Sequence, residues 1–246
     1  MRIFLAGASG AIGRRLTPML IAAGHQVTGM TRNPASARAL EAAGIRRALV
    51  DVFDSDAVKA AVIAAAPEAI IHQLTDLPGS LEDEAQLAAA YPRNARIRIE
   101  GTRNLTAAAQ AAAARRFIVQ SVAFGYAPGS EPHSEDDPLA VAASPRAVTI
   151  RGAADMERQV LTSGMEAIVL RYAFFYGPGT WHLDPVRKPS LHIDAAAQAA
   201  LLAVTRGQPG IYNIAEEDGT VSIAKARAAL GFDPAFRLRA SDETAC

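Results

Sequence analysis

Cysteine and lysine are scarce in this chain. The only cysteine, Cys246, is the last of the 246 residues, so the sequence offers no internal disulfide and no cysteine-based metal site. The only lysines are Lys59, Lys188 and Lys225, which restricts any catalytic motif that depends on a lysine. We therefore expect neither a metal centre nor a disulfide framework.

Long apolar runs and net charge are also missing. No apolar run approaches the roughly 18 residues of a membrane-spanning helix, and the opening run is too short for a signal peptide. The 25 basic residues balance the 25 acidic ones, so nothing favours a nucleic acid or an anionic membrane as a partner. We expect a cytoplasmic protein whose partner is a small-molecule substrate.

Short apolar runs alternate with alanine-rich amphipathic stretches along most of the chain. Strand-like runs cover 2–7, 25–31, 47–52, 68–74, 116–122 and 166–172, and helix-like stretches cover 11–24, 35–44, 56–66, 101–114 and 152–164. Three of these helices stop at a glycine just before a strand, at Gly24, Gly44 and Gly164. The alternation predicts the α/β class, with a doubly wound parallel sheet covered by helices on both faces.

Two segments rich in proline, glycine and charge interrupt this rhythm, at 125–148 and 177–190. Both are expected to leave the carboxyl ends of strands, where open α/β sheets bind their ligands. Both are longer than the usual connection of about 2–6 residues. We interpret them as substrate-side loops; ordinary connections are the alternative.

The segment LAGASGAIGR, residues 5–14, joins the first strand to the first helix. Gly7 suits a tight turn, Gly10 allows a phosphate to approach the backbone, and Gly13 allows the helix to pack closely on the strand. The helix N-terminus at Ala11 and Ile12 presents unpaired N–H groups to an anion, and Ser9 adds a hydroxyl donor. This spacing in a strand–turn–helix context predicts a dinucleotide site.

The end of the second strand distinguishes between the two nicotinamide cofactors. NAD-binding folds place an acid there for the ribose 2′-OH, but this chain has Thr31 and Arg32, with Arg38 on the next helix. An arginine suits a 2′-phosphate because it offers a fixed charge and paired donors. We therefore predict NADP(H) in preference to NAD(H), with Asp51 facing the adenine amino group.

Several segments in order resemble the extended and atypical branch of the short-chain dehydrogenase/reductase superfamily, the NAD-dependent epimerase/dehydratase family. The matching segments are GASGAIG (7–13), LVDVFD (49–54), IIHQLT (70–75), EGTRNLTAAA (100–109), FIVQS (117–121), RYAFFYGPG (171–179), HIDAAAQAALLA (192–203) and GIYNIA (210–215). The resemblance implies a Rossmann domain over 1–176 and a small substrate lobe over 177–246, with one segment returning to the core. It also implies that the helix of HIDAAAQAALLA helps to close the lobe.

The resemblance also assigns cofactor contacts to residues of this chain. Asp51 and Val52 would contact adenine, Leu74 and Thr75 would flank the ribose next to the nicotinamide, and Tyr172 to Phe175, Phe174 among them, would lie near the nicotinamide amide. A homodimer through 84–114 and 152–164 is the oligomer that the family likeness suggests.

The catalytic pattern of that family is missing. Its chemistry uses a tyrosine and a lysine four residues apart on one helix, because the lysine charge lowers the tyrosine pKa for proton exchange with the substrate. None of the tyrosines here has a lysine four residues on. Alignment on Glu157 puts Thr149 and Ala153 at those two positions, and Val122 where the reactive serine would be.

Candidates to replace the pair are Tyr126, which heads the first long loop, Ser121, which ends the fifth strand, and Arg98, which occupies the place of a family asparagine. Ser121 could bond the cofactor instead, Tyr126 could simply pack against the loop, and Arg98 could be structural. Further residues in or near the loops are His133, Arg151, Tyr176 and His182.

Three functions are compatible with these features. The first is an NADP(H)-dependent oxidoreductase that transfers hydride to a small carbonyl, enone or imine. The second is a non-catalytic NADP(H) sensor or scaffold, suggested by the missing pair. The third is a nucleotide-sugar epimerase or dehydratase, which the short lobe and the missing pair disfavour.

Overall fold

Seven parallel strands form the central sheet, and the computed structural model gives their order as β3-β2-β1-β4-β5-β6-β9. The strands are β1 (Arg2–Ala6), β2 (Gln26–Thr31), β3 (Arg46–Leu49), β4 (Ala69–His72), β5 (Arg116–Val122), β6 (Glu166–Tyr172) and β9 (Gly210–Ile214). The structure describes residues 1–78, 84–141 and 147–238. The doubly wound parallel sheet predicted from the sequence is confirmed.

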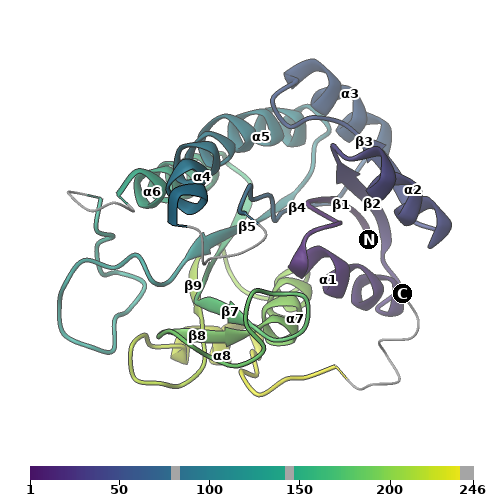
Figure 1. The fold of residues 1–246 in the computed structure, drawn as a ribbon. Coiled ribbons are helices and arrows are strands. Elements are labelled where there is room, and N and C mark those ends of the chain that lie inside the picture. Colours follow the sequence, from purple (N-terminus) through teal and green to yellow (C-terminus); the bar gives the residue numbers. More distant parts are fainter. Residues whose placement is uncertain (79–83, 142–146, 239–246) are drawn as a thin grey trace.

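Helices cover both faces of this sheet (Figure 1). The helices are α1 (Ala11–Ala22), α2 (Pro34–Ala42), α3 (Ser55–Ala65), α4 (Glu84–Arg96), η1 (Ile97–Gly101), α5 (Thr102–Ala111), α6 (Ala147–Leu161), α7 (Ile193–Ala203) and α8 (Ala224–Leu230). Helices α3, α4, α5 and α6 lie together on one face, and α1 and α7 pack against each other on the opposite face. The segment η1 is a π-helical turn that joins α4 to α5 without a break.

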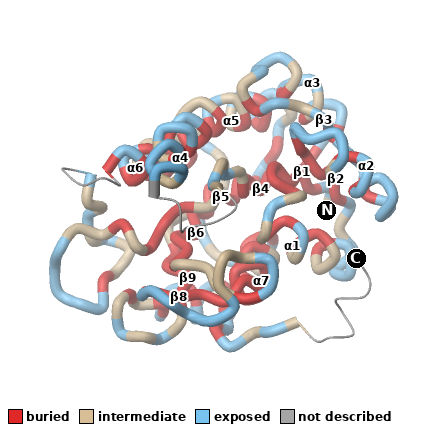
Figure 2. Tube along the Cα trace, viewed as in Figure 1, coloured by how far each residue is buried: buried red, intermediate tan, exposed pale blue. Residues whose placement is uncertain are grey.

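The inner strands are buried because successive side chains point to opposite faces, and both faces are covered; the edge strand β3 is mostly exposed. In β1, Ile3 and Leu5 belong to the apolar core that contains α1 and α7, whereas Phe4 and Ala6 belong to the core under α3 and α5. The burial pattern in Figure 2 shows this central layer. A continuous apolar run such as RIFLA is therefore what a two-sided parallel strand requires.

The C-terminal part contributes to the main body as well as to a smaller lobe. Strand β9 joins the central sheet beside β6. Helix α7 packs on α1 over that sheet and also contacts β8 of the lobe. A two-stranded sheet of β7 (Phe174–Tyr176) and β8 (Ser190–His192) forms the lobe beside it.

Glycines end three helices as the sequence predicts. Gly24, Gly44 and Gly164 have φ values of +81°, +72° and +80°, a conformation that glycine adopts without strain. Within the described ranges, no helix is both long enough and apolar enough to cross a membrane.

A buried ion pair joins α6 to β6. Arg171 donates from Nε and Nη2 to the two carboxylate oxygens of Glu157, at 2.9 and 2.8 Å. Both side chains are almost inaccessible to solvent. Removal of one partner would leave the other charge buried and unpaired, which costs more than the loss of an exposed pair.

We predict that Glu157→Gln lowers the free energy of unfolding by about 3–5 kcal/mol, because Arg171 keeps its charge without a carboxylate. The matched control is Glu217→Gln, which removes the exposed partner of Arg227 and should cost at most about 1 kcal/mol. Urea denaturation of both variants measures the difference. Equal losses would show that the buried pair does not hold α6 against the sheet.

Candidate functional site

The turn between β1 and α1 is built so tightly that its glycines cannot be replaced without displacing backbone. Gly7 has a φ of +94°, and a Cβ there would lie 2.9 Å from the carbonyl carbon of Gln73. A Cβ on Gly13 would lie 2.2 Å from the carbonyl oxygen of Gly7. The close contact between Gly7 and Gly13 therefore sets α1 directly against the end of β1.

This turn leaves an anion-binding end on α1. The helix begins at Ala11 with Gly10 as its N-cap, and Gly10 provides no side-chain cap. The N–H groups of the first turn have no partner within a helix, and the helix dipole favours negative charge at this end. A Cβ on Gly10 would meet only the Gly7 carbonyl oxygen, at 3.3 Å, so a phosphate could approach from that side.

A cavity of about 410 Å³, here called the cofactor cleft, extends from this turn along the carboxyl ends of the strands. It is lined by Gly10, Ala11, Ile12, Arg14, Gln73, Thr75, Asp76, Leu77, Pro78, Gln120, Phe175, Gly179, Thr180 and Trp181. Both polar atoms of the Gln73 carboxamide are buried; the side chain lies beside the Tyr172 hydroxyl, but neither atom makes a hydrogen bond of good geometry with a described residue. An unsatisfied amide in the cleft fits a ligand with hydroxyl or amide groups.

The other end of the phosphate turn lies beside β2. The Ser9 and Thr31 hydroxyl oxygens are 3.3 Å apart. Arg32 is 59% exposed and pairs with Asp76 of the cofactor cleft at 3.6 Å, and Asp76 also pairs with Arg93 at 3.1 Å. Exposed pairs of this kind are weak, so Arg32 can exchange its carboxylate for a phosphate.

The predicted adenine residues lie after β3. Asp51 is exposed and accepts a hydrogen bond from the backbone N–H of Phe53. Val52 is buried, and its carbonyl accepts a hydrogen bond from Asn104. Leu74 and Thr75 follow β4, and Thr75 lines the cofactor cleft.

A second cavity of about 110 Å³, the aromatic cavity, adjoins the cofactor cleft. Its lining consists of Thr75, Leu77, Leu87, Tyr91, Asn94, Arg98, Gln120, Ser121, Val122, Phe124, Thr149, Tyr172, Ala173, Phe174, Phe175, Trp181 and Arg187. Phe124 and Phe174 stack with ring centroids 4.2 Å apart. The Trp181 indole donates to the carbonyl of Pro78 at 3.0 Å, which holds the 177–190 loop over the site.

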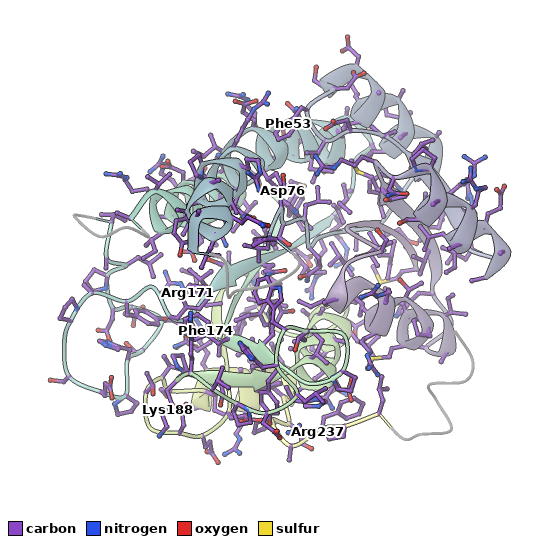
Figure 3. All side chains as sticks on the ribbon, in the orientation of Figure 1. Phe53, Asp76, Arg171, Phe174, Lys188 and Arg237 are labelled. Carbon is purple, nitrogen blue, oxygen red and sulfur yellow. The ribbon has the colours of Figure 1, made fainter. Side chains whose placement is uncertain are left out.

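Figure 3 labels one residue of each cavity. Asp76 of the cofactor cleft lies between the layer of α4 and α5 and the lobe of β7 and β8, and Phe174 of the aromatic cavity is the first residue of β7 itself. The two cavities therefore occupy the carboxyl side of the sheet, where ligands bind in open α/β folds.

Arg98 is the buried cation of the aromatic cavity. It lies on the π-helical turn η1 and is 8% exposed, and its Nη1 donates to the Thr149 carbonyl and hydroxyl oxygens at 2.7 and 2.5 Å. Burial lowers the pKa of Arg98 to about 10, so it remains charged at neutral pH. Burial and the nearby Arg98 charge lower the pKa of His72 to about 3, so that imidazole is neutral.

Ser121 and Tyr126 both donate their hydroxyl protons to structural partners. Ser121 lines the aromatic cavity, but its hydroxyl donates to Glu157 at 2.5 Å. The Tyr126 hydroxyl donates to Asn213 at 2.6 Å and accepts from Arg171 at 2.9 Å. Tyr126 lines neither cavity, and burial raises the pKa of its phenol.

The two predicted substrate-side loops differ in position. The 177–190 loop contributes Gly179, Thr180, Trp181 and Arg187 to the two cavities. None of residues 125–141 lines either cavity, and residues 142–146 lie outside the described ranges. The first loop instead packs toward β9 and the C-terminal region, through Glu135 and the backbone of His133.

The other sequence candidates are distributed as follows. Tyr172 and Phe174 line the aromatic cavity, and the Tyr172 hydroxyl donates to the Ala196 carbonyl at 3.1 Å. His133, Arg151, Tyr176 and His182 line neither cavity. Within the part of the chain that the structure describes, no cluster of three or more His, Cys, Asp or Glu side chains could hold a metal.

Tyr91 and Gln73 are among the lining residues that the sequence does not reveal. Tyr91 of α4 is half-buried and lines the aromatic cavity, and no hydrogen bond links its hydroxyl to another described residue. No motif surrounds it, so only the tertiary position identifies it. Gln73 lies within the segment IIHQLT, but the sequence does not show that its amide would be unsatisfied.

Comparisons with known proteins agree with this geometry. A model of the NAD(P)H-binding family matches residues 7–188. The 3-diazoavenalumate denitrifying reductase of a Streptomyces species is 38% identical over 240 residues, which cover 89% of this chain and 77% of that protein.

Solved structures share the fold at much lower identity. UDP-glucose 4-epimerase from Thermotoga maritima has a TM-score of 0.75 and 18% identity, with 100% of this chain and 96% of that chain covered. UDP-glucose 4-epimerase from Thermus thermophilus, in complex with NAD, has a TM-score of 0.76 and 18% identity, with 97% and 95% covered. Together with the glycine turn and the reductase relative, these matches lead to one conclusion. The chain belongs to the NAD(P)H-binding family, as an atypical member of the short-chain dehydrogenase/reductase superfamily.

Proposed function

We propose that the protein is an NADPH-dependent reductase that transfers hydride to a small aromatic electrophile. The observation that carries this proposal is the wall that the cofactor cleft and the aromatic cavity have in common, formed by Thr75, Leu77, Gln120, Phe175 and Trp181. A ring in the aromatic cavity would lie beside a nicotinamide in the cleft. Hydride transfer depends mainly on such positioning.

The residues of the cleft suit each part of the cofactor. The N-terminus of α1 and the open side of Gly10 would hold the pyrophosphate. Ser9, Thr31 and Arg32 would hold the 2′-phosphate, and no carboxylate residue stands among positions 29–33 to repel it. The Gln73 amide would hydrogen-bond the nicotinamide riboside. When bound, the reduced cofactor supplies a hydride.

The missing tyrosine–lysine pair favours an electrophile that needs no proton. An arenediazonium ion accepts hydride at its terminal nitrogen to give a neutral diazene, which loses N₂ and leaves a C–H bond in place of the C–N bond. The Streptomyces relative is, by its name, a reductase of a diazo compound. A carbonyl or enone would need a proton from water or Tyr91 in addition to hydride.

The structure gives less support to the two other functions. The aromatic cavity, about 110 Å³ in volume, has apolar walls and is poorly matched to a nucleotide sugar, and the likeness to epimerases is one of fold at 18% identity. A redox sensor would not require a substrate cavity beside the cofactor cleft. A reductase accounts for both cavities.

We predict protein-dependent loss of NADPH absorbance with benzenediazonium-type acceptors, faster than with matched benzaldehydes or aryl enones. The diazo acceptor needs only hydride, whereas the others also need an acid that this site lacks in its usual form. Reactions without protein, and with excess NADP⁺, are the controls. Tight NADPH binding without NADPH oxidation by any of these acceptors would favour the sensor hypothesis instead.

Arg32→Ala should weaken NADPH binding by about tenfold or more and leave NADH binding unchanged, because only NADPH offers a 2′-phosphate to the guanidinium. The matched control is Arg46→Ala, at the amino end of β3. This substitution should change neither the NADPH affinity nor the NADH affinity. Quenching or enhancement of cofactor fluorescence gives both affinities. If Arg32→Ala weakens both cofactors equally, Arg32 does not select NADPH.

Tyr91→Phe tests whether the Tyr91 phenol donates a proton when a diazo acceptor is reduced. With a diazo acceptor the rate should stay within about twofold and be flat between about pH 6 and 8, since no phenol donates a proton. Over this range His72, with a pKa of about 3, stays neutral, and Arg98, with a pKa of about 10, stays charged. A large loss of diazo turnover in Tyr91→Phe would instead make Tyr91 the acid.

A further inference from the structure

The aromatic cavity has room for no more than one ring. Its volume of about 110 Å³ is smaller than that of the apolar protein cavity of about 150 Å³ that holds benzene. Tyr91, Phe124, Phe174 and Trp181 supply flat walls, which favour stacked or edge-on contacts with a planar ligand. This inference rests on the proposed function, because it concerns the substrate of that site.

The polar end of this cavity carries an uncompensated positive charge. Arg98 is 8% exposed and lies within salt-bridge distance of no carboxylate in residues 1–78, 84–141 and 147–238. Glu157 is the acid whose charge acts on Arg98, but Arg171 already binds both of its carboxylate oxygens. His72, the other titratable group beside Arg98, is neutral. A buried cation without an anion is costly, so this position favours an anionic ligand.

The hydrogen bonds of Arg98 leave one edge of the guanidinium for that ligand. Both bonds to Thr149 come from Nη1, and Nε and Nη2 make none with the described residues. Arg98 itself lines the aromatic cavity and keeps 8% of its surface exposed. The edge formed by Nε and Nη2 matches the two oxygens of a carboxylate.

We propose that the substrate is a single-ring aromatic carboxylate, that its carboxylate binds Arg98, and that its ring fills the aromatic cavity. Thr149 is the positioning residue, because its hydroxyl and carbonyl fix the guanidinium. In the family that the sequence resembles, a tyrosine stands at this position of the helix. Here the charged Arg98 guanidinium occupies the polar end of the aromatic cavity, and it would bind an anion instead of exchanging a proton.

The test is equilibrium binding to the full-length protein saturated with NADP⁺, followed by calorimetry. The probes are benzoate, its neutral analogue benzamide, and cyclohexanecarboxylate, which keeps the charge but not the flat ring. We expect benzoate to bind at least about tenfold more tightly than either analogue. In Arg98→Met the preference for benzoate over benzamide should vanish, while NADP⁺ affinity is unchanged.

Two further variants keep the test decisive. Arg98→Lys retains the charge but loses the paired N–H donors of the guanidinium, so it should lose most of the preference for benzoate over benzamide. This variant tests the site even if Arg98→Met fails to fold. Arg187→Met removes the exposed cation of the cavity and should leave most of the preference intact, because exposed charges bind weakly.

Several results would overturn the proposal. They are equal affinity for benzoate and benzamide, no benzoate binding at all, full preference in either Arg98 variant, or a preference that disappears in Arg187→Met. Because the readout is binding and not turnover, it is independent of the reductase assay. If benzoate binding depends on Arg98 but no acceptor oxidises NADPH, the carboxylate site stands and the proposed reductase activity is wrong.

Discussion

The contact between Gly13 and the Gly7 carbonyl is the constraint on which the candidate site depends. The space between them is too small for a methyl group, since a Cβ on Gly13 would lie 2.2 Å from that oxygen. This contact brings the start of α1 to the end of β1 and directs the unpaired N–H groups of the helix at the cofactor cleft. The cleft and the aromatic cavity then follow from the sheet order, because β1, β4 and β5 are neighbours and end on the same side.

The buried polar side chains near the ends of β5 and β6 fall into two separate groups. Ser121, Glu157, Arg171, Tyr126 and Asn213 form one buried network, in which donors and acceptors bind one another. That network stabilises the junction of β5, β6 and α6 and leaves Ser121 and Tyr126 poorly placed for proton transfer. Arg98 stands outside it and lines the aromatic cavity, so the buried charge of that cavity comes from a guanidinium that cannot act as an acid at neutral pH.

The fold could be predicted from the sequence because it depends on local, repeated signals. Strands 116–122 and 166–172 appear with the predicted bounds, and the glycine turn required only the spacing of Gly7, Gly10 and Gly13. The roles of Tyr91 and Gln73 could not be predicted, since each depends on which groups lie opposite in space. Tyr126 shows the same limit: its position after β5 suggested catalysis, but Arg171 and Asn213, distant in sequence, bind its hydroxyl.

A kinetic isotope effect distinguishes hydride transfer within the site from oxidation of the cofactor in solution. The measurement is single-turnover oxidation of NADPH deuterated at either face of nicotinamide C4, with the protein and a diazo acceptor in excess. We expect a slower reaction for one labelled face and no change for the other, because a cofactor held in the cleft would present one face to the aromatic cavity. Protein-dependent oxidation that is equally fast with both labels and with unlabelled NADPH, or no oxidation at all, would contradict hydride transfer within the site.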